Sequence, residues 1–243
     1  MQKILAGALF LGLAFISPAQ AETASVAVAA NFTAVAEQLA AQFKAETGND
    51  LSLSFGATGG LYTQITQGAP FDILLAADDI RPTKAVEDGY GVAGSVFTYA
   101  VGALALYSTS LDVTDGEAAL KGPFDKLAIA DPATAPYGQA AVETLTALGI
   151  YDAVSARLVT GENISQTLQF VESGNAELGF VAASQVVGKP GVWLVPEELH
   201  KSIRQDAVLL KTGADNVAAT AFMDFLKSDA AIAVIMAAGY GVQ

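Results

Sequence analysis

Cysteine is absent from this 243-residue chain, and histidine occurs once, as His200 in the polar segment "PEELHKS". Without cysteine, the fold can contain neither a disulfide bond nor a zinc–thiolate site, and no thiol can serve as a nucleophile. A single histidine with no evident partner does not complete any of the familiar nucleophile–base sets. The sequence therefore predicts a protein that is not an enzyme.

Basic residues are also scarce, with 12 Lys and Arg against 25 Asp and Glu and a formal net charge of −13. This balance argues against nucleic acids and anionic lipid surfaces as partners, because both are bound through basic patches. No Lys or Arg occurs within 45–80, 127–156 or 158–188. A small anion bound by these segments would be held by neutral donors and helix N-termini, as suits a receptor that must release its ligand.

The N-terminus carries the apolar run "ILAGALFLGLAFI", which follows Lys3 and precedes Ala19-Gln20-Ala21, and no other stretch is long and apolar enough to cross a membrane. A short apolar run that ends in small residues is typical of a signal peptide and too short to span a membrane comfortably. We expect residues 1–21 to be removed after Ala21 and the mature protein to lie free in a bacterial periplasm. The 52% apolar and 15% charged content favours a folded chain.

Short strand-like and helix-like segments alternate along the mature chain. "ASVAVAA", a helix over 32–47, "LSLSF", a helix over 59–67 and "FDILLAA" form the βαβαβ rhythm of a doubly wound sheet. The apolar run "SVFTYAVGALALYS" (95–108) is too long for one ordinary strand, which favours a strand that crosses between lobes. The rhythm then returns with "KLAIADP", 136–149, "ARLVT", 163–173 and "ELGFVA", followed by "GVWLVP", "DAVLLK" and helices over 214–227 and 229–238.

Two such series, with the chain returning to the first lobe near its end, predict an α/β protein of two lobes. Each lobe is a doubly wound and mainly parallel sheet, and two hinge strands join them. Roughly 220 mature residues suit one large domain or two small lobes. We place lobe I at 22–101 and 206–243 and lobe II at 102–205. No internal sequence repeat relates the lobes, so this division rests on the pattern alone.

Four turns each follow a predicted strand and open a predicted helix. A helix start has unpaired N–H groups and a partial positive charge, and the carboxyl ends of strands are where doubly wound sheets bind ligands. Asn, Thr and Gly cap helices in many proteins, so a single turn of this kind is ordinary. Four of them predict a small anion site; they are Ala30-Asn31-Phe32-Thr33, Gly56-Ala57-Thr58-Gly59-Gly60, Ala135-Pro136-Tyr137-Gly138 and Gly161-Glu162-Asn163-Ile164-Ser165.

Nucleotide and metal motifs are not completed. No lysine follows Gly60, as a P-loop requires, and the Gly-x-Gly-x-x-Gly match at 89–94 lies after a helix-like segment, in the reverse of the required context. The adjacent Asp78 and Asp79 would point to opposite faces of a strand, so a helix cap is expected rather than a metal pair. We expect no cofactor and no free metal cation.

Several segments resemble the periplasmic molybdate-binding proteins of ABC transporters, and the resemblance covers nearly the whole mature chain. The segments include "VAVAANFTAVAEQLAAQFKAETG", "SFGATGGLYTQITQGAPFDILLAAD", "LAIADPATAPYGQAAVETLTALG", "ENISQTLQFVESGNAELGFV" and "AFMDFLKSDAA". The resemblance implies a type II periplasmic binding fold that closes on molybdate or tungstate. It also implies an inner-membrane permease as partner, and we expect a monomer.

The same resemblance implies four ligand-binding residues. They are Asn31 after the first strand, Thr58 after the second, and the backbone amides of Tyr137 and Ile164. Some members of the family place a ligand-binding tyrosine where this chain has Ala182. We expect the hydroxyl of Tyr137 to replace it from the opposite loop.

Alternative ligands and an enzymatic alternative remain open at this stage. Neutral donors without a carboxylate acceptor favour an anion that carries no proton, since a buried O–H without an acceptor costs about 1–3 kcal/mol. Sulfate has no such proton and would have to be rejected by size. The same fold could also bind another oxyanion or a small organic acid, and an exported hydrolase would have to use Asp78, Asp79 and His200.

Overall fold

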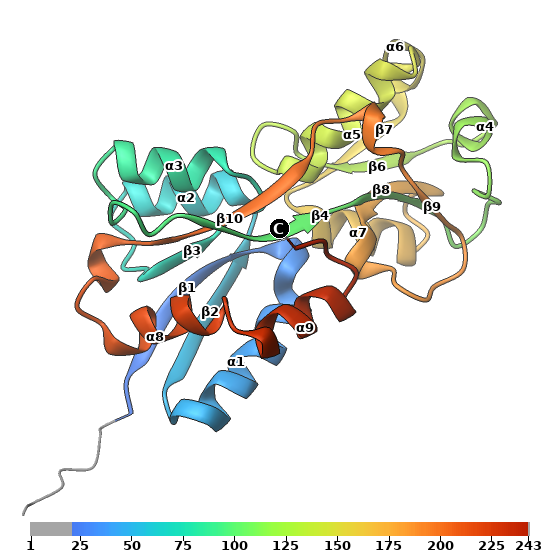
Figure 1. The fold of residues 1–243 in the computed structure, drawn as a ribbon. Helices are drawn as coiled ribbons and strands as arrows, with labels where there is room; N and C mark the ends of the chain where they lie inside the picture. The colour runs from blue at the N-terminus through green and yellow to red at the C-terminus, as the bar shows by residue number, and fades with distance from the viewer. Residues whose placement is uncertain (1–20, 243) are drawn as a thin grey trace, which may run out of the picture.

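The computed structural model describes residues 21–242, so all of the predicted signal peptide except Ala21 lies outside the described residues. Two five-stranded sheets lie side by side, each with helices packed on both faces (Figure 1). Within the described part of the chain, no helix combines the length and the apolar character that crossing a bilayer requires.

The first sheet has the order β2-β1-β3-β10-β4. Strand β1 pairs in parallel with β2 and β3, and β10 runs antiparallel to both β3 and β4. Four strands therefore share one direction and β10 opposes them. The bounds are β1 (Thr23–Ala29), β2 (Asp50–Gly56), β3 (Ile73–Leu75), β4 (Phe97–Gly102) and β10 (Ile203–Leu209).

The second sheet repeats this plan with the order β7-β6-β8-β5-β9. Strand β6 pairs in parallel with β7 and β8, and β5 runs antiparallel to β8 and β9. Both sheets are thus mixed but mainly parallel, which confirms the predicted fold class. The bounds are β5 (Leu104–Tyr107), β6 (Leu127–Ala130), β7 (Leu158–Gly161), β8 (Leu178–Ala182) and β9 (Val192–Leu194).

Helices cover both faces of each sheet because their apolar stripes need a sheet face to bury. On the first sheet, α1, α8 and α9 pack on one face and α2 and α3 on the other. On the second sheet, α4, α5 and α6 share one core and α7 contributes to the opposite one. Their bounds are α1 (Thr33–Thr47), α2 (Thr58–Thr66), α3 (Ile80–Glu87), α4 (Gly116–Lys121), α5 (Pro136–Ala147), α6 (Tyr151–Val154), α7 (Ile164–Glu172), α8 (Val217–Phe225) and α9 (Asp229–Ala237).

The connection between the sheets runs through the apolar segment 95–108. Strand β4 belongs to the first sheet and β5 to the second, with only Ala103 between them. This arrangement confirms that the long run crosses from one sheet to the other. We call the first sheet with its helices lobe I and the second sheet with its helices lobe II. The residue boundaries given above for the lobes stay a prediction.

One strand begins earlier than its sequence suggests. The apolar pattern predicts a strand at "DAVLLK", but β10 already begins at Ile203 and includes Gln205 and Asp206, which are buried. The strand continues there because its backbone pairs with β4 of the same sheet. The polar side chains of this segment do not follow the apolar pattern of a strand, so the extension could not be recognised. Buried polar groups of this kind require hydrogen-bond partners.

Candidate anion-binding site between the lobes

All four predicted turns meet at one cavity. Its lining includes Asn31, Thr58, Tyr137 and Ile164. The first two residues follow strands of lobe I, and the other two follow strands of lobe II. The expected residues therefore converge between the lobes, as the carboxyl ends of parallel strands do in doubly wound folds. Their binding role stays a prediction.

Three backbone N–H groups at this cavity have no hydrogen-bond acceptor among the described residues. They belong to Thr58, Tyr137 and Ile164, which lie in the first turns of α2, α5 and α7. All three residues are at most 3% exposed. Buried N–H groups are almost always paired, so three unpaired ones converging on a cavity indicate a ligand with hydrogen-bond acceptors.

Neighbouring amides of the same helix starts are already used within the protein. The N–H of Gly138 donates to the carbonyl of Ala135 at 2.9 Å. The N–H groups of Ser165 and Gln166 donate to the side chain of Asn163 at 3.0 and 3.1 Å. The N–H groups of Thr58, Tyr137 and Ile164 are therefore left for a ligand at the cavity, while these neighbouring amides bond to protein acceptors.

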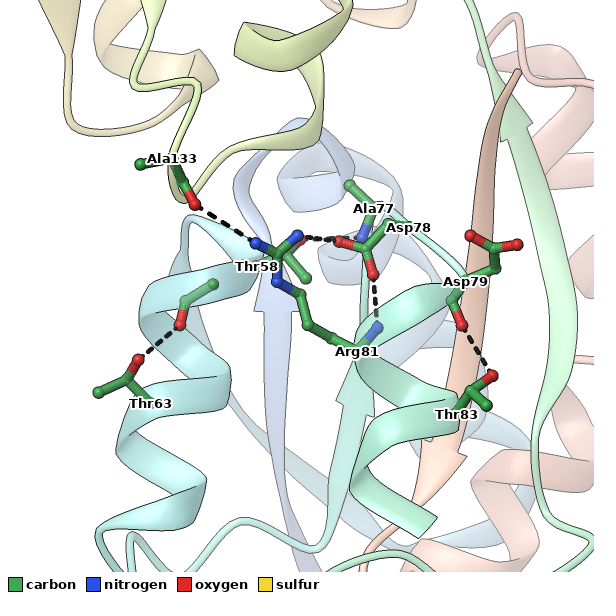
Figure 2. A network of polar contacts seen from close by, with 9 residues as sticks. Thr58, Thr63, Ala77, Asp78, Asp79, Arg81, Thr83 and Ala133 are labelled. Atoms are coloured by element: carbon green, nitrogen blue, oxygen red, sulfur yellow. Dashed lines mark hydrogen bonds and ion pairs between the residues drawn. The ribbon is translucent and has the colours of Figure 1, made fainter. Parts of the chain in front are cut away.

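The hydroxyl of Thr58 adds a further donor. Its Oγ1 accepts a hydrogen bond from the N–H of Ala77 at 3.0 Å, a pair that lies at the centre of Figure 2. No described residue accepts the hydrogen of this hydroxyl, so the hydrogen remains available to a ligand.

The side chain of Asn31 is committed elsewhere. Its Nδ2 donates to Oε1 of Gln205 at 2.9 Å and to the hydroxyl of Tyr240 at 3.0 Å. An amide has two hydrogens, so none is left for a ligand while these bonds hold. Any donor that Asn31 offers the cavity would then have to come from its backbone, which differs from the expected use of the side chain.

The hydroxyl of Tyr137 is used as an acceptor but not as a donor among the described residues. It accepts from Nε2 of Gln205 at 3.1 Å, and no described residue accepts its own hydrogen. Burial raises the pKa of Tyr137 well above its usual value, so the phenol stays neutral and remains a donor. Ala182, on β8, offers no side-chain hydrogen bond.

One cation, Arg81, lies just beyond the segment that lacks basic residues. Arg81, in the first turn of α3, forms an ion pair with Asp78 at 2.5 Å. Its Nη2 lies 3.4 Å from the carbonyl oxygen of Ala133 in lobe II, so the side chain reaches across the cleft (Figure 2). Arg81 is not part of the cavity lining, and its charge is balanced by Asp78.

The residues that an enzyme would need are used structurally. Oδ1 of Asp78 accepts from the N–H of Arg81 at 2.8 Å in the first turn of α3. The N-cap residue, Asp79, makes no side-chain cap bond and pairs with Arg204 at 3.1 Å. His200 is half-buried rather than exposed, and its Nδ1 donates to the carbonyl of Lys201 at 2.7 Å. Over residues 21–242, no three His, Cys, Asp or Glu side chains gather as a metal would require.

Sequence reasoning missed Gln205 and Tyr240. Gln205 is fully buried in β10, and Tyr240 near the C-terminus donates to the backbone carbonyl of Asn31 at 2.8 Å. A period-two alternation over Ile203, Gln205 and Ala207 was the available signal for a buried strand position. Nothing local could have indicated their partners, because these contacts join residues at least 56 positions apart in the chain.

Comparison with known proteins supplies a family. Residues 24–241 match the family described as bacterial extracellular solute-binding protein. The molybdate-binding protein ModA of Rhodobacter capsulatus is 52% identical over 236 residues, which cover 96% of this chain and 93% of that protein. The protein of the same name from Azotobacter vinelandii is 52% identical over 233 residues, which cover 93% of this chain and 92% of the relative.

Solved structures agree with these relatives. The periplasmic molybdate-binding protein of Azotobacter vinelandii superposes with a TM-score of 0.86 and 36% identity, covering 90% of this chain and 99% of that one. The sulfate-binding protein SubI of Mycobacterium tuberculosis H37Rv superposes with a TM-score of 0.74, covering 90% and 86%, at 14% identity. The second likeness concerns the fold alone.

Proposed function

The chain belongs to the family of bacterial extracellular solute-binding proteins, and we propose that it captures molybdate between its lobes and delivers it to the permease of an ABC transporter. Its fold is the type II periplasmic binding fold, and its family consists of solute-binding proteins rather than enzymes. The names of its two relatives at 52% identity support molybdate as the ligand. Tungstate, a dianion of the same shape, is proposed as a second ligand.

One observation carries this proposal: the cavity offers donors without an opposing carboxylate. The free N–H groups of Thr58, Tyr137 and Ile164 come from three helix starts, where the helix dipole also favours an anion. An oxyanion that kept a proton would bury an O–H without an acceptor, at a cost of about 1–3 kcal/mol. The geometry therefore supports a fully ionised, compact oxyanion.

The roles of individual residues are part of the proposal. Thr58 would donate its hydroxyl and its N–H, Tyr137 its N–H and its hydroxyl, and Ile164 its N–H. Asn31 would contribute from its backbone while its side chain bonds to Gln205 and Tyr240. The ligand is thus shared by lobe I and lobe II, so binding would draw the lobes together.

Transport also requires an exported protein. We propose that residues 1–21 direct export and are removed after Ala21, leaving a periplasmic receptor. The formal charge of −13 suits a receptor that meets basic loops of a permease, because opposite charges accelerate encounter.

Isothermal titration calorimetry of the mature chain tests the function directly. We expect saturable heat with molybdate and tungstate at low concentration, and much weaker binding of phosphate and sulfate, measured at higher concentrations of these anions. A rise in melting temperature with molybdate should accompany binding. Binding heat with sulfate but not with molybdate would instead identify a sulfate receptor. The absence of binding heat with both molybdate and tungstate would refute the proposal.

A further inference from the structure

Gln205 joins the ligand residues of the two lobes. Its Oε1 accepts from Nδ2 of Asn31 at 2.9 Å, and its Nε2 donates to the hydroxyl of Tyr137 at 3.1 Å. The side chain is fully buried in β10. A single amide on a strand of lobe I therefore contacts one predicted ligand residue of each lobe.

The local strand geometry sets Gln205 apart from its neighbour. The pairing of β10 with β4 shifts register here, because Gln205 opposes Ala100 while Asp206 opposes Thr98. Tyr99, the residue that the shift leaves unpaired, places its hydroxyl 3.2 Å from Oε1 of Gln205. Such bulges re-aim side chains near functional sites.

Strand β4 carries a glycine, Gly102, where the hydrogen bond between Gln205 and Tyr137 passes. A Cβ on Gly102 would lie 2.1 Å from the hydroxyl oxygen of Tyr137 and 2.6 Å from Nε2 of Gln205. Both distances are far below van der Waals contact, so any side chain at position 102 would displace the pair. The hydrogen bond between Gln205 and Tyr137 thus passes directly over β4.

The hydrogen bonds of this network run in one direction. The Tyr240 hydroxyl uses its hydrogen on the carbonyl of Asn31 and accepts from Nδ2 of that residue, which fixes the amide orientation of Asn31. Nδ2 then faces Oε1 of Gln205, which leaves Nε2 of Gln205 to face Tyr137. The phenol consequently receives a hydrogen bond from the protein and has only its own hydrogen left to give.

We propose that Gln205 is a positioning residue that sets the selectivity of the site, by holding the Tyr137 hydroxyl as a donor toward the ligand. The inference rests on the proposed function. It explains how Gln205, a buried residue of β10, excludes oxyanions that carry a proton. A protonated oxyanion would need a hydrogen-bond acceptor here. The Tyr137 hydroxyl already accepts from Gln205, so it faces the ligand as a donor.

Two substitutions of similar size test the direction of the bond. Gln205→Glu provides carboxylate oxygens to both neighbours, so the Tyr137 hydrogen should turn away from the ligand toward position 205. Molybdate affinity should fall by about ten-fold or more, and the preference for molybdate over hydrogen phosphate should narrow. Gln205→Met removes the hydrogen bonds to Asn31, Tyr99 and Tyr137 and should weaken molybdate binding by a smaller factor.

The neighbouring Asp206→Asn serves as the matched control. Asp206 is equally buried on the same strand but accepts from the hydroxyl of Thr98 at 2.7 Å, away from the ligand residues. Its substitution should leave both the affinity and the selectivity unchanged. Calorimetry with molybdate and phosphate, across the pH range in which phosphate gains its second proton, supplies the selectivity ratio that a structural role alone would not alter.

The outcomes separate this inference from the proposed function. A wild-type protein that binds molybdate while both Gln205 variants keep its affinity and selectivity overturns the inference and leaves the function intact. Equal losses for every oxyanion, with an unchanged selectivity ratio, also overturn it, since they reveal only a packing role. A wild-type protein that binds no oxyanion overturns both. If Gln205→Glu does not fold, Gln205→Met and Gly102→Ala, which displaces the same pair, decide the matter by the same ratio.

Discussion

The N–H of Gly59 donates to the carbonyl oxygen of Thr134 at 2.8 Å, and this hydrogen bond joins the first turn of α2 in lobe I to a turn of lobe II. Beside it, Arg81 reaches the carbonyl of the preceding residue, Ala133, at 3.4 Å (Figure 2). Two adjacent carbonyls of one lobe therefore accept from the other lobe next to the cavity. These contacts exist only when the lobes are together, so they stabilise the closed arrangement.

Gly59→Ala should weaken ligand binding without touching the ligand. A Cβ at this position would lie 3.0 Å from both Cα and the carbonyl oxygen of Thr134, and backbone atoms there cannot move aside cheaply. We expect a loss of about 1–3 kcal/mol in molybdate affinity, the usual cost of overpacking. Calorimetry provides the affinity and small-angle scattering the degree of closure.

Gly60→Ala is the control for this change, because a Cβ there would meet nothing within 4 Å. It should bind like the wild type and gain slightly in stability from better helix propensity. Equal affinities for the Gly59 and Gly60 variants would show that the contact with Thr134 does not limit closure.

Thr58→Ala should reduce molybdate affinity by about 1–3 kcal/mol, since a hydrogen bond to a charged ligand is lost. Thr58→Ser keeps the hydroxyl and should stay close to the wild type. Thr63→Ala, in the same helix, removes an exposed hydroxyl that only donates to the carbonyl of Gly59, and should leave binding unchanged. Titration calorimetry of the three variants measures the difference, and similar affinities for Thr58→Ala and Thr63→Ala would remove Thr58 from the site.

Tyr137→Phe should weaken molybdate binding by about 1–3 kcal/mol but not abolish it, because the backbone N–H of the residue remains. The variant also leaves Nε2 of Gln205 without its acceptor. Tyr107→Phe is a suitable comparison, since Tyr107 is equally buried in β5 but does not line the cavity. Equal affinities of these two variants would assign the Tyr137 hydroxyl a purely structural role.

Ile164→Pro removes a backbone donor while keeping the helix. Proline is favoured in the first turn of a helix, and the preceding Asn163 already has an extended backbone with φ −153° and ψ 175°. Molybdate affinity should fall by about ten-fold or more, as for a lost bond to a charged ligand. Ile164→Val, which retains the N–H, controls for lost apolar contact. A proline variant with the native circular dichroism spectrum and native affinity would exclude this N–H from binding.

Alkaline pH should destabilise the protein through its buried tyrosines. Burial raises the pKa of Tyr240 to about 12 and that of Tyr99 well above its usual value. The unfolded chain loses these protons near pH 10, whereas the folded chain retains them, so the free energy of unfolding falls as the pH rises from about 10 to about 12. Below pH 10 these groups contribute no pH dependence. Urea titrations at several pH values measure the slope, and Tyr240→Phe should flatten it; an identical slope would contradict the assignment.

The alternation of elements could be predicted because it is written locally. Strands such as β1 and β6 are short apolar runs, and the residues at their carboxyl ends are helix starters. Ile164 could therefore be placed in the first turn of its helix, and Thr58 in the turn directly before a helix that in fact begins at Thr58. Since parallel strands bring these ends to one edge, the convergence at one cavity also followed from the pattern.

The start of β10 and the role of Arg81 could not be predicted in this way. The segment that opens β10 carries polar side chains, and only its pairing with β4, about 100 residues earlier, makes it a buried strand. Arg81 follows a stretch without basic residues, and only the packing of the lobes brings its guanidinium to the cleft.

The sequence by itself determined the class of the protein: two α/β series, four helix starts at strand ends and no cation among them, because short-range periodicity and composition encode these features. Tertiary structure alone decided which donors remain for a ligand. It committed the amide of Asn31 to Gln205 and Tyr240, and it left the N–H groups of Thr58, Tyr137 and Ile164 without acceptors among the described residues. The physical reason is that a hydrogen-bond donor is free or occupied according to partners far away in the chain, and only folding brings those partners within reach.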